Sequence, residues 1–442
     1  MKRAKKIFLL LFVLALSLSS LLFGCSNKET AGEEGKRKDG RVVVDFWTFW
    51  GSEIRRPIIE KIIDDFNKSQ NKIYVKHTYL PWGDIWTKEL AAVAAGNPPD
   101  LIVQDINTVA QRAQKNQNTN LAKYIKKDPE IKKRFFPKLY NATLYKGDPY
   151  ALPFNTDTRI LFYNKDAFKE AGLDPEKPPQ TWEELENYGK KLDIKKGGHY
   201  ERIGYVPGHG IGPDIWMINA NGKGFWDYEK NKPIINSDTN VVTLEWFKKY
   251  QDYYGQKELA TFKAEFGDQS SDPFISGKVA MITEAATFYT KIRDYGNGMN
   301  FGVAPLPERE PGSGHTSWGG GFVLEIPRGA KHADAAWEFM KYLTDVKAQE
   351  YWAVKNFDNV ANIEAAKKAA KSPELTVEAK KVYDLATKNM ENTILTPVPL
   401  ATPDYLNLVK PEIDAALLGK KTPKEALDDA QKAVEKLVKS NK

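Results

Sequence analysis

The stretch VVVDFW at residues 42–47 begins the region that decides the fold, and its largely apolar run is typical of a buried strand. Pro57 then stands near the start of a helix whose apolar residues share one stripe, namely Ile58, Ile59, Ile62, Ile63 and Phe66. Residues 72–79 alternate as a second strand, residues 86–95 form an alanine-rich helix, and LIV at 101–103 is a third strand. This alternation predicts an α/β fold with a parallel sheet and crossover helices.

The same alternation resumes after Pro153, so the fold extends well beyond one sheet. Residues 159–163 are expected to form a strand, and Thr181 with Glu184 forms a capping box that opens a helix. Further along, residues 321–326 predict another strand and residues 333–344 an amphipathic helix. Because 442 residues exceed one ordinary domain, we expect two or three domains.

The N-terminus differs from the rest of the chain. Basic residues at positions 2–6 precede 17 largely apolar residues, 7–23, which are typical of a secretory signal peptide spanning 1–24. The alternative is an uncleaved membrane helix, for which 17 residues is the short limit. Residues 26–40 are polar and lack apolar periodicity, so we expect a flexible tether over 25–40.

Cys25 is the only cysteine, and it follows the apolar run directly. The sequence LFGC at 22–25 resembles a lipobox, in which the thiol receives a diacylglycerol chain and becomes the first residue of the mature protein. The alternative is a chance thiol in a signal peptide. A single cysteine also excludes internal disulfides and any metal site built from several cysteines.

Charge and motifs exclude several function classes. Removing the signal lowers the net charge from +7 to +3, because it takes away four of the 65 basic residues and none of the 58 acidic ones. A net charge this close to zero gives no indication of a surface that binds nucleic acid. The chain has no phosphate-binding glycine loop, HExxH or G-x-S-x-G motif, and its five histidines lack ligand spacing. We therefore predict no catalytic residue, no metal and no cofactor.

Aromatic residues are abundant, with 11 Trp, 20 Tyr and 21 Phe. Trp47 and Trp50 follow the first strand, Trp82 precedes a helix, Trp216 stands before an Asn/Gly-rich loop, and Trp318 precedes three glycines. Open α/β sheets bind ligands outside the carboxyl ends of their strands, and flat aromatic faces suit sugar rings. The alternative, that these tryptophans belong to the core, stays open from the sequence.

Four groups of residues carry a family resemblance: GNPPDLI at 96–102; LPFN at 152–155 with LFYNKD at 161–166 and PQTWEEL at 179–185; SGKVAM at 276–281; and GVAPLP at 302–307 with GGG at 319–321 and AAWEFM at 335–340. With them the chain resembles family 1 extracellular solute-binding proteins, the group that contains maltose-binding protein and many oligosaccharide-binding lipoproteins. The resemblance extends from residue 41 to the end.

The resemblance implies a two-lobed periplasmic-binding-protein fold (type II-like), in which each lobe has a central sheet flanked by helices. The first lobe would be 41–156 plus 305–345, and the second 157–304 plus 346–442. The chain would cross near 155–159, 303–305 and 344–347. Ligand would bind in the cleft, and the membrane subunits of an ABC importer would recognise the closed form. The protein would be a monomer, lipid-anchored through Cys25 at the extracytoplasmic face of the cell membrane.

The resemblance also implies which residues bind the ligand, for which we expect an oligosaccharide of two or more rings. These residues are Trp47, Trp50, Trp82, Asp105, Asp157, Arg159, Trp216, Glu284, Phe288, Trp318 and Tyr405. Glu284 departs from the family pattern of a glycine and an aromatic, and Phe288 is expected to supply the ring instead. Carboxylates and arginine suit sugars because hydroxyls both donate and accept hydrogen bonds.

Two alternatives remain from the sequence. A glycoside hydrolase would need two carboxylates about 5 to 10 Å apart, for which Asp105 and Glu284 are the candidates. A solute-binding protein of the same fold could instead take a polyamine, whose sites also combine aromatic rings with acids. A phosphate ester or iron is a further alternative, but the clustered metal ligands that iron needs are missing from the sequence.

Overall fold

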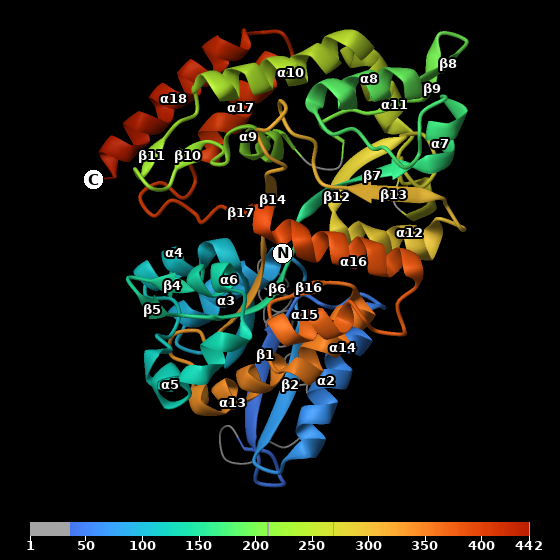
Figure 1. Cartoon of the computed structure of the whole chain (residues 1–442). Helices are drawn as coiled ribbons and strands as arrows, with labels where there is room; N and C mark the ends of the chain where they lie inside the picture. The colour runs from blue at the N-terminus through green and yellow to red at the C-terminus, as the bar shows by residue number, and fades with distance from the viewer. Residues whose placement is uncertain (1–35, 210–211, 268, 442) are drawn as a thin grey trace, which may run out of the picture.

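The computed structural model describes residues 36–209, 212–267 and 269–441 (Figure 1). The predicted signal peptide, Cys25 and most of the predicted tether lie outside these residues. The described chain forms two lobes, one above the other in Figure 1, with a few segments running between them. Each lobe has its own sheet with helices around it, which confirms the predicted fold class.

A mixed six-stranded sheet forms the centre of the first lobe, the lower one in Figure 1. β1 pairs in parallel with β2 and β3, as predicted, whereas β15 runs antiparallel to β3 and β6. The order β16-β6-β15-β3-β1-β2 corresponds to Asn359–Val360, Leu152–Thr156, Gly321–Glu325, Leu101–Asp105, Val42–Thr48 and Ile73–Tyr79. The carboxyl ends of β1 and β3 share one edge, the usual ligand side of an α/β sheet.

Helices cover this sheet, and the predicted apolar stripe of the first helix is buried. Phe66 of that helix packs on Phe339 with ring centroids 4.9 Å apart, and Phe339 meets Phe46 of β1 at 5.5 Å. The first-lobe helices are α2 (Arg55–Ser69), α3 (Asp84–Ala94), α4 (Val109–Gln114), α5 (Ala122–Lys127), α6 (Pro137–Asn141), α13 (Ala333–Leu343), α14 (Val346–Asn356) and α15 (Ile363–Ala369). A short hairpin joins β4 (Leu144–Tyr145) to β5 (Asp148–Pro149).

Two amide side chains close the outer edge of β2, which is an end strand of the sheet. Asn67 donates from Nδ2 to the carbonyl of Val75 (3.0 Å) and accepts the N–H of Val75 at Oδ1 (2.8 Å). Gln70 does the same for Ile73, at 2.8 Å in both directions. These bonds satisfy backbone groups that would otherwise be a template for pairing with another chain.

A three-stranded antiparallel sheet, in the order β12-β7-β13, forms the centre of the second lobe. Its strands are β12 (Met281–Ala285), β7 (Arg159–Asn164) and β13 (Phe301–Ala304). Two hairpins accompany it, β8 (Ile194–Lys196) with β9 (His199–Arg202) and β10 (Trp226–Asp227) with β11 (Lys232–Pro233). The helices are α7 (Lys165–Glu170), α8 (Trp182–Leu192), α9 (Pro213–Asn221), α10 (Asp238–Tyr254), α11 (Gln256–Ala264), α12 (Tyr289–Tyr295), α16 (Val377–Asn389), α17 (Leu406–Leu417) and α18 (Pro423–Ser440).

The capping box predicted for α8 forms only in part. The hydroxyl of Thr181 accepts the N–H of Glu184 at 3.2 Å, as predicted. The carboxylate of Glu184, however, accepts the N–H of Gln180 at 2.7 Å rather than that of Thr181. The helix still begins at Trp182, because the N–H groups of Gln180 and Glu184 at its N-terminal end both have side-chain acceptors.

The first crossing between the lobes agrees with the prediction, and the other two do not. β6 ends at Thr156 and β7 begins at Arg159, so the chain crosses at 157–158. Residues 305–316 stay on the second lobe, where Glu308 exchanges 2.8 Å backbone hydrogen bonds with Gln180 and Trp182. The second crossing is therefore β14 (Ser317–Gly319), not 303–305.

The chain returns to the second lobe between α15 and α16, at 370–376, and not at 344–347, and β17 (Thr393–Leu395) then pairs in parallel with β14. α14 packs on α2, and β16 adds to the first-lobe sheet beside β6. Residues 346–369 therefore belong to the first lobe, although they were assigned to the second. A two-residue strand such as β16 carries no sequence pattern that says which sheet it joins, which explains the error.

Buried hydroxyl groups tie the first crossing to β14 and β17. The hydroxyl oxygens of Thr158 and Thr393 are 2.6 Å apart, and Thr158 lies 3.3 Å from the hydroxyl of Ser317. Asn389, at the end of α16, donates from Nδ2 to Thr158 at 2.8 Å. Thr158 thus links the first crossing to both β14 and β17, which are joined to each other by strand pairing.

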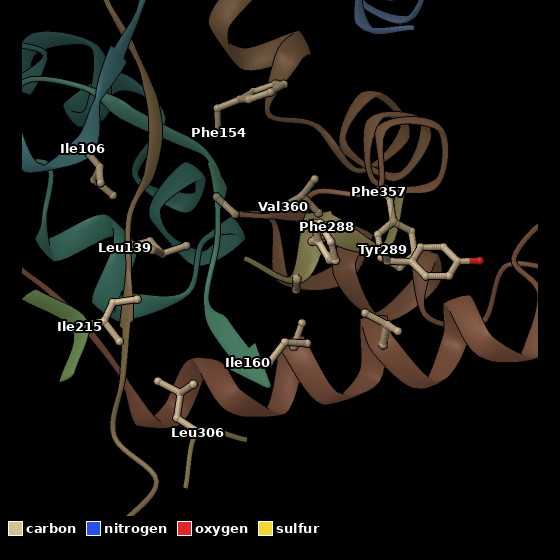
Figure 2. Close-up of a cluster of buried hydrophobic side chains, with 14 of the residues drawn as sticks. Ile106, Leu139, Phe154, Ile160, Ile215, Phe288, Tyr289, Leu306, Phe357 and Val360 are labelled. Atoms are coloured by element: carbon tan, nitrogen blue, oxygen red, sulfur yellow. The ribbon is translucent and has the colours of Figure 1, made fainter. Parts of the chain in front are cut away.

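An apolar contact also joins the lobes. Tyr289 of α12 packs on Phe357, which follows α14, with ring centroids 4.5 Å apart. Figure 2 shows these two rings beside Phe288, with Phe154 and Val360 of the first lobe nearby. The core is therefore continuous from one lobe to the other at this point.

Candidate functional site

Charged side chains gather where the lobes meet. Asp105 ends β3 of the first lobe, and Asp157 and Arg159 stand on the first crossing. The carboxylate of Asp157 accepts a hydrogen bond from the guanidinium of Arg159 and another from the N–H of Gly320 at 2.6 Å. Asp105 accepts the N–H of Asn107 at 2.8 Å through one oxygen. The predicted acids and arginine are therefore brought to one place, at the carboxyl end of β3.

Trp318 lies on the second crossing and is fixed on two sides. The guanidinium carbon of Arg159 lies 4.5 Å from the centre of its ring. Its indole N–H donates to the hydroxyl of Thr396 at 2.9 Å. A cation over a tryptophan face and a bound indole N–H together set the orientation of the ring. The ring is half-buried, so it keeps an exposed part.

A cavity of about 120 Å³ opens beside Trp318. Tyr405, expected from the sequence to contact ligand, is in its wall together with Trp318. The other polar and aromatic wall residues were not predicted, namely Asp214, Lys223, Phe225, Tyr228 and Thr396. Rings on several sides with a few polar groups between them form the kind of wall that binds a sugar.

Burial is the main influence on the pKa of the acids around this site. It raises the pKa of Asp105, of Glu284 and of Asp214, since each carboxylate loses solvation in its charged form. The positive charge of Arg159 opposes this shift for the pKa of both Asp105 and Glu284. Glu284 is therefore within electrostatic reach of the cluster at the crossing.

Two of the cations near the cavity are already paired. Arg159 binds Asp157, and the ammonium of Lys223 lies 3.0 Å from Asp227 and 3.6 Å from Glu229. The carboxylates of Asp105 and Glu284 have no ion pair within hydrogen-bonding distance among the described residues. The site therefore offers acceptors for hydroxyl groups rather than a clamp for an anion.

A row of aromatic rings leads from the rim of the first lobe to Asp105. Trp82 is 66% exposed and contacts Trp86, with ring centroids 5.3 Å apart. Trp86 meets Phe49 at 6.1 Å, and Phe49 meets Phe322 at 4.7 Å. Phe322 is the cross-strand partner of Asp105. We call Trp82, Trp86, Phe49 and Phe322 the aromatic row.

Three predicted site residues are core residues in the structure. Trp50 is 1% exposed and is packed against Phe154 (5.0 Å) and Trp352 (4.4 Å). Trp216 is fully buried and contacts Trp182 at 5.5 Å. Trp50 follows β1 in a loop and Trp216 stands within α9, and both side chains are buried in the interior of their lobes, so neither presents a face to the cleft.

Phe288 is the third predicted site residue that belongs to the core. Trp47 lies at a different place from the one expected. Phe288 is buried against Phe162 and Phe274, at 5.3 Å and 6.0 Å, as a cap on the second-lobe sheet. Trp47 lies within β1 and not in the loop after it, and its indole N–H donates to Asp45 at 2.8 Å. That bond occupies the polar group a ligand would use.

The residues missed by the sequence prediction had weak signals. Asp214 follows Gly212-Pro213 at the first turn of α9, a position that favours an acid for purely helical reasons. Phe49 and Phe322 look like ordinary strand residues until the fold places them in one row. Within the described residues, no group of three or more metal-ligating side chains comes together. In the same part of the chain, every helix is too short or too polar to cross a bilayer.

Comparison with protein families gives one match over most of the chain. The family described as bacterial extracellular solute-binding protein matches residues 61–403. Among individual relatives, the arabinooligosaccharide-binding protein of Bacillus subtilis is 24% identical and covers 96% of this chain and 98% of its own. The sn-glycerol-3-phosphate-binding periplasmic protein UgpB of Pectobacterium atrosepticum is 26% identical, over 88% of this chain and 89% of its own.

Solved structures give the same result. CpMnBP1 with mannotriose bound superposes with a TM-score of 0.77 at 32% identity, and covers 88% of this chain and 99% of its own. Maltose-bound MalE3 of T. maritima superposes with a TM-score of 0.72 at 22% identity, over 89% of this chain and 99% of its own. The second likeness concerns the fold alone. The two lobes and the crossings between them are thus shared with proteins that hold their ligands.

Proposed function

The chain belongs to the bacterial extracellular solute-binding proteins, and from this premise we propose that it is the substrate-binding subunit of an ABC-type importer, which captures an oligosaccharide between its lobes. The ligand would then pass to the membrane permease without chemical change. The relative at 32% identity holds mannotriose, and another relative is named for arabinooligosaccharides. Both support a ligand of several sugar rings.

The cavity beside Trp318 carries this proposal. It combines the rings of Trp318, Tyr228 and Tyr405 with the carboxylate of Asp214. Aromatic faces stack on the C–H groups of sugar rings, and carboxylates accept hydrogen bonds from sugar hydroxyls. The aromatic row on the first lobe supplies a second apolar surface, so a ligand with several rings has several places to stack.

The paired cations argue against an anionic ligand. UgpB is named for glycerol phosphate, which a protein holds best with unpaired arginine, lysine or backbone N–H donors. Here Arg159 is bound to Asp157, and Asp105 and Glu284 add negative charge beside it. A phosphate at this site would meet carboxylates first. We therefore favour a neutral oligosaccharide over a phosphate ester.

We further propose that the protein is a monomeric lipoprotein, exported by the signal at 1–24 and anchored through Cys25. We also propose that it is not an enzyme. Asp105 and Glu284 were the candidate pair for glycoside hydrolysis, and Arg159 acts on the pKa of both. Burial outweighs that charge and raises the pKa of both acids, whereas a hydrolase needs environments that push the two pKa values apart.

Isothermal titration calorimetry tests the function directly. Purified protein is titrated with mannotriose, maltotriose, arabinotriose, the matching disaccharides and monosaccharides, and sn-glycerol 3-phosphate. We expect saturable binding of at least one trisaccharide that weakens as the chain is shortened, and no binding of glycerol phosphate. Binding of glycerol phosphate alone would overturn the proposed ligand class. New reducing ends after incubation with the bound sugar would overturn the non-enzymatic role.

A further inference from the structure

A groove of about 770 Å³ runs along the outer edge of the second-lobe sheet. One wall is β13, and the others come from α12 and α16 (Figure 1). No residue of this groove belongs to the wall of the cavity beside Trp318. The apolar part of its surface consists of Tyr289, Ile292, Met299, Phe301, Val382 and Leu385. It is thus a second concave site, separate from the proposed ligand site.

The register of the sheet shows which backbone groups face the groove. The N–H of Lys165, next to β7, donates to the carbonyl of Asn300 at 3.0 Å. In an antiparallel pair, backbone bonding alternates along the strand, so Gly302 and Ala304 also face β7. The N–H and C=O groups of Phe301 and Val303 therefore point away from the sheet. No hydrogen bond from any described residue reaches these four groups.

This edge of β13 differs from the outer edge of β2. Along β2, the side chains of Asn67 and Gln70 satisfy the backbone of Val75 and Ile73. Along β13, no side chain in the described part of the chain performs that task. Sheet edges left open in this way are templates for an added strand. The chain thus closes one edge and leaves the other open inside a groove.

We propose that β13 binds an extended peptide segment of a partner protein, which adds to the second-lobe sheet as a fourth strand. The open N–H and C=O groups of residues 301 and 303 supply alternating donors and acceptors, and the two residues lie roughly 7 Å apart along the strand. An extended backbone presents the complementary groups at the same spacing, whereas the backbone N–H and C=O groups of a helix are already hydrogen-bonded to one another. This interaction is independent of sugar binding in the cleft.

The groove also defines the chemistry of that segment. Alternate side chains of an added strand would point to the apolar residues Ile292 on α12 and Val382 and Leu385 on α16. The charges at the rim balance, because Lys165 binds Glu176 at 2.7 Å, Arg293 binds Asp294 at 2.7 Å, and Glu378 and Lys381 add one charge of each sign. The groove therefore fits an uncharged segment with apolar residues at every second position.

A peptide copy of β7 is a suitable probe, because β7 already pairs with the opposite edge of β13. A fluorescein-labelled hexapeptide with the sequence of residues 159–164, RILFYN, is titrated with purified protein by fluorescence anisotropy. We expect saturable binding. The same peptide with N-methyl groups on alternate amides should bind about tenfold more weakly, as expected for hydrogen bonds left unmade.

Two variants at one position give the matched comparison. Val303→Pro removes an N–H that no residue of the sheet uses, a change that edge strands tolerate, and should weaken peptide binding about tenfold. Val303→Ala keeps the N–H and should bind like wild type. Both variants should bind sugar normally by calorimetry, which separates this proposal from the function proposed for the cleft.

Lack of saturable peptide binding by wild type at roughly millimolar concentration would overturn the proposal. Equal binding by wild type and by a folded Val303→Pro variant would overturn it as well. If Val303→Pro does not fold, as judged by lost sugar binding and circular dichroism, the N-methylated peptide decides. Equal affinity of the methylated and unmethylated peptides then counts against an added strand.

Discussion

Replacing Trp318 by alanine should weaken sugar binding far more than it weakens the fold. The ring forms a wall of the cavity and is held by Arg159 and by Thr396. Truncating an aromatic contact residue costs about 1 to 3 kcal/mol of binding, which is roughly tenfold to a hundredfold in affinity. The fold loses the cation–π contact and one hydrogen bond, each worth about 1 kcal/mol at a partly exposed position.

Trp50→Ala is the matched control, because the same change is made in a ring with the opposite environment. Trp50 is 1% exposed and packed between Phe154 and Trp352. Removing a buried tryptophan costs about 3 to 5 kcal/mol of unfolding free energy. Sugar affinity of the folded fraction should stay near wild type, since no atom of Trp50 reaches the cavity.

Calorimetry with the best oligosaccharide and urea denaturation are measured on both variants. Trp318→Phe is added, because it keeps a ring beside Arg159 but lacks the donor to Thr396. We expect its affinity between those of wild type and Trp318→Ala. Normal sugar binding by Trp318→Ala, together with an early urea transition, would make Trp318 a structural residue. The cavity would then be the wrong site.

The other predictions concern the anchor and titrating groups. Fatty-acid labelling should be lost in Cys25→Ser, and labelling that persists in this variant would contradict lipidation. Burial raises the pKa of Asp105, so its ionised form costs stability as the pH rises through that raised pKa. Asp105→Asn should therefore raise the unfolding free energy at pH 7, with the gain vanishing near pH 4, while sugar binding falls about tenfold. Burial lowers the pKa of His209 to about 4. Below about pH 6.5 the unfolded chain therefore binds a proton at this histidine that the folded protein does not, and the free energy of unfolding decreases as the pH falls. His209→Gln should flatten the stability curve over that range, and an unchanged slope would contradict this reasoning.

The elements of this fold could be predicted where a local pattern encodes them. The apolar stripe of α2, the run of β3 and the capping residue of α8 each act over a few neighbouring residues, and the structure has all three. The crossings could not be predicted in the same way. Whether residues 305–316 stay on one lobe depends on hydrogen bonds between Glu308 and residues 180 and 182, which are distant in sequence.

The same difference between local patterns and distant contacts applies to the candidate site. Asp105, Asp157 and Arg159 lie together as the resemblance implied, because strand ends and crossings are positions that a motif can mark, and their contact with a ligand stays a prediction. Trp50 and Trp216 were wrong because a tryptophan beside a loop can turn inward as easily as outward. Which way it turns depends on whether a distant partner such as Trp352 leaves space for it.

The buried hydroxyls that join the first crossing to β14 and β17 limit how the lobes can move. A single linker would let one lobe swivel freely, but Thr158, Ser317 and Thr393 connect three strands side by side and resist twisting. Opening and closing is then confined to a bend about one axis. One pair of dyes, placed on opposite rims, would consequently report the state of the whole molecule through a single distance. The protein is in this respect a ready frame for an optical sugar sensor.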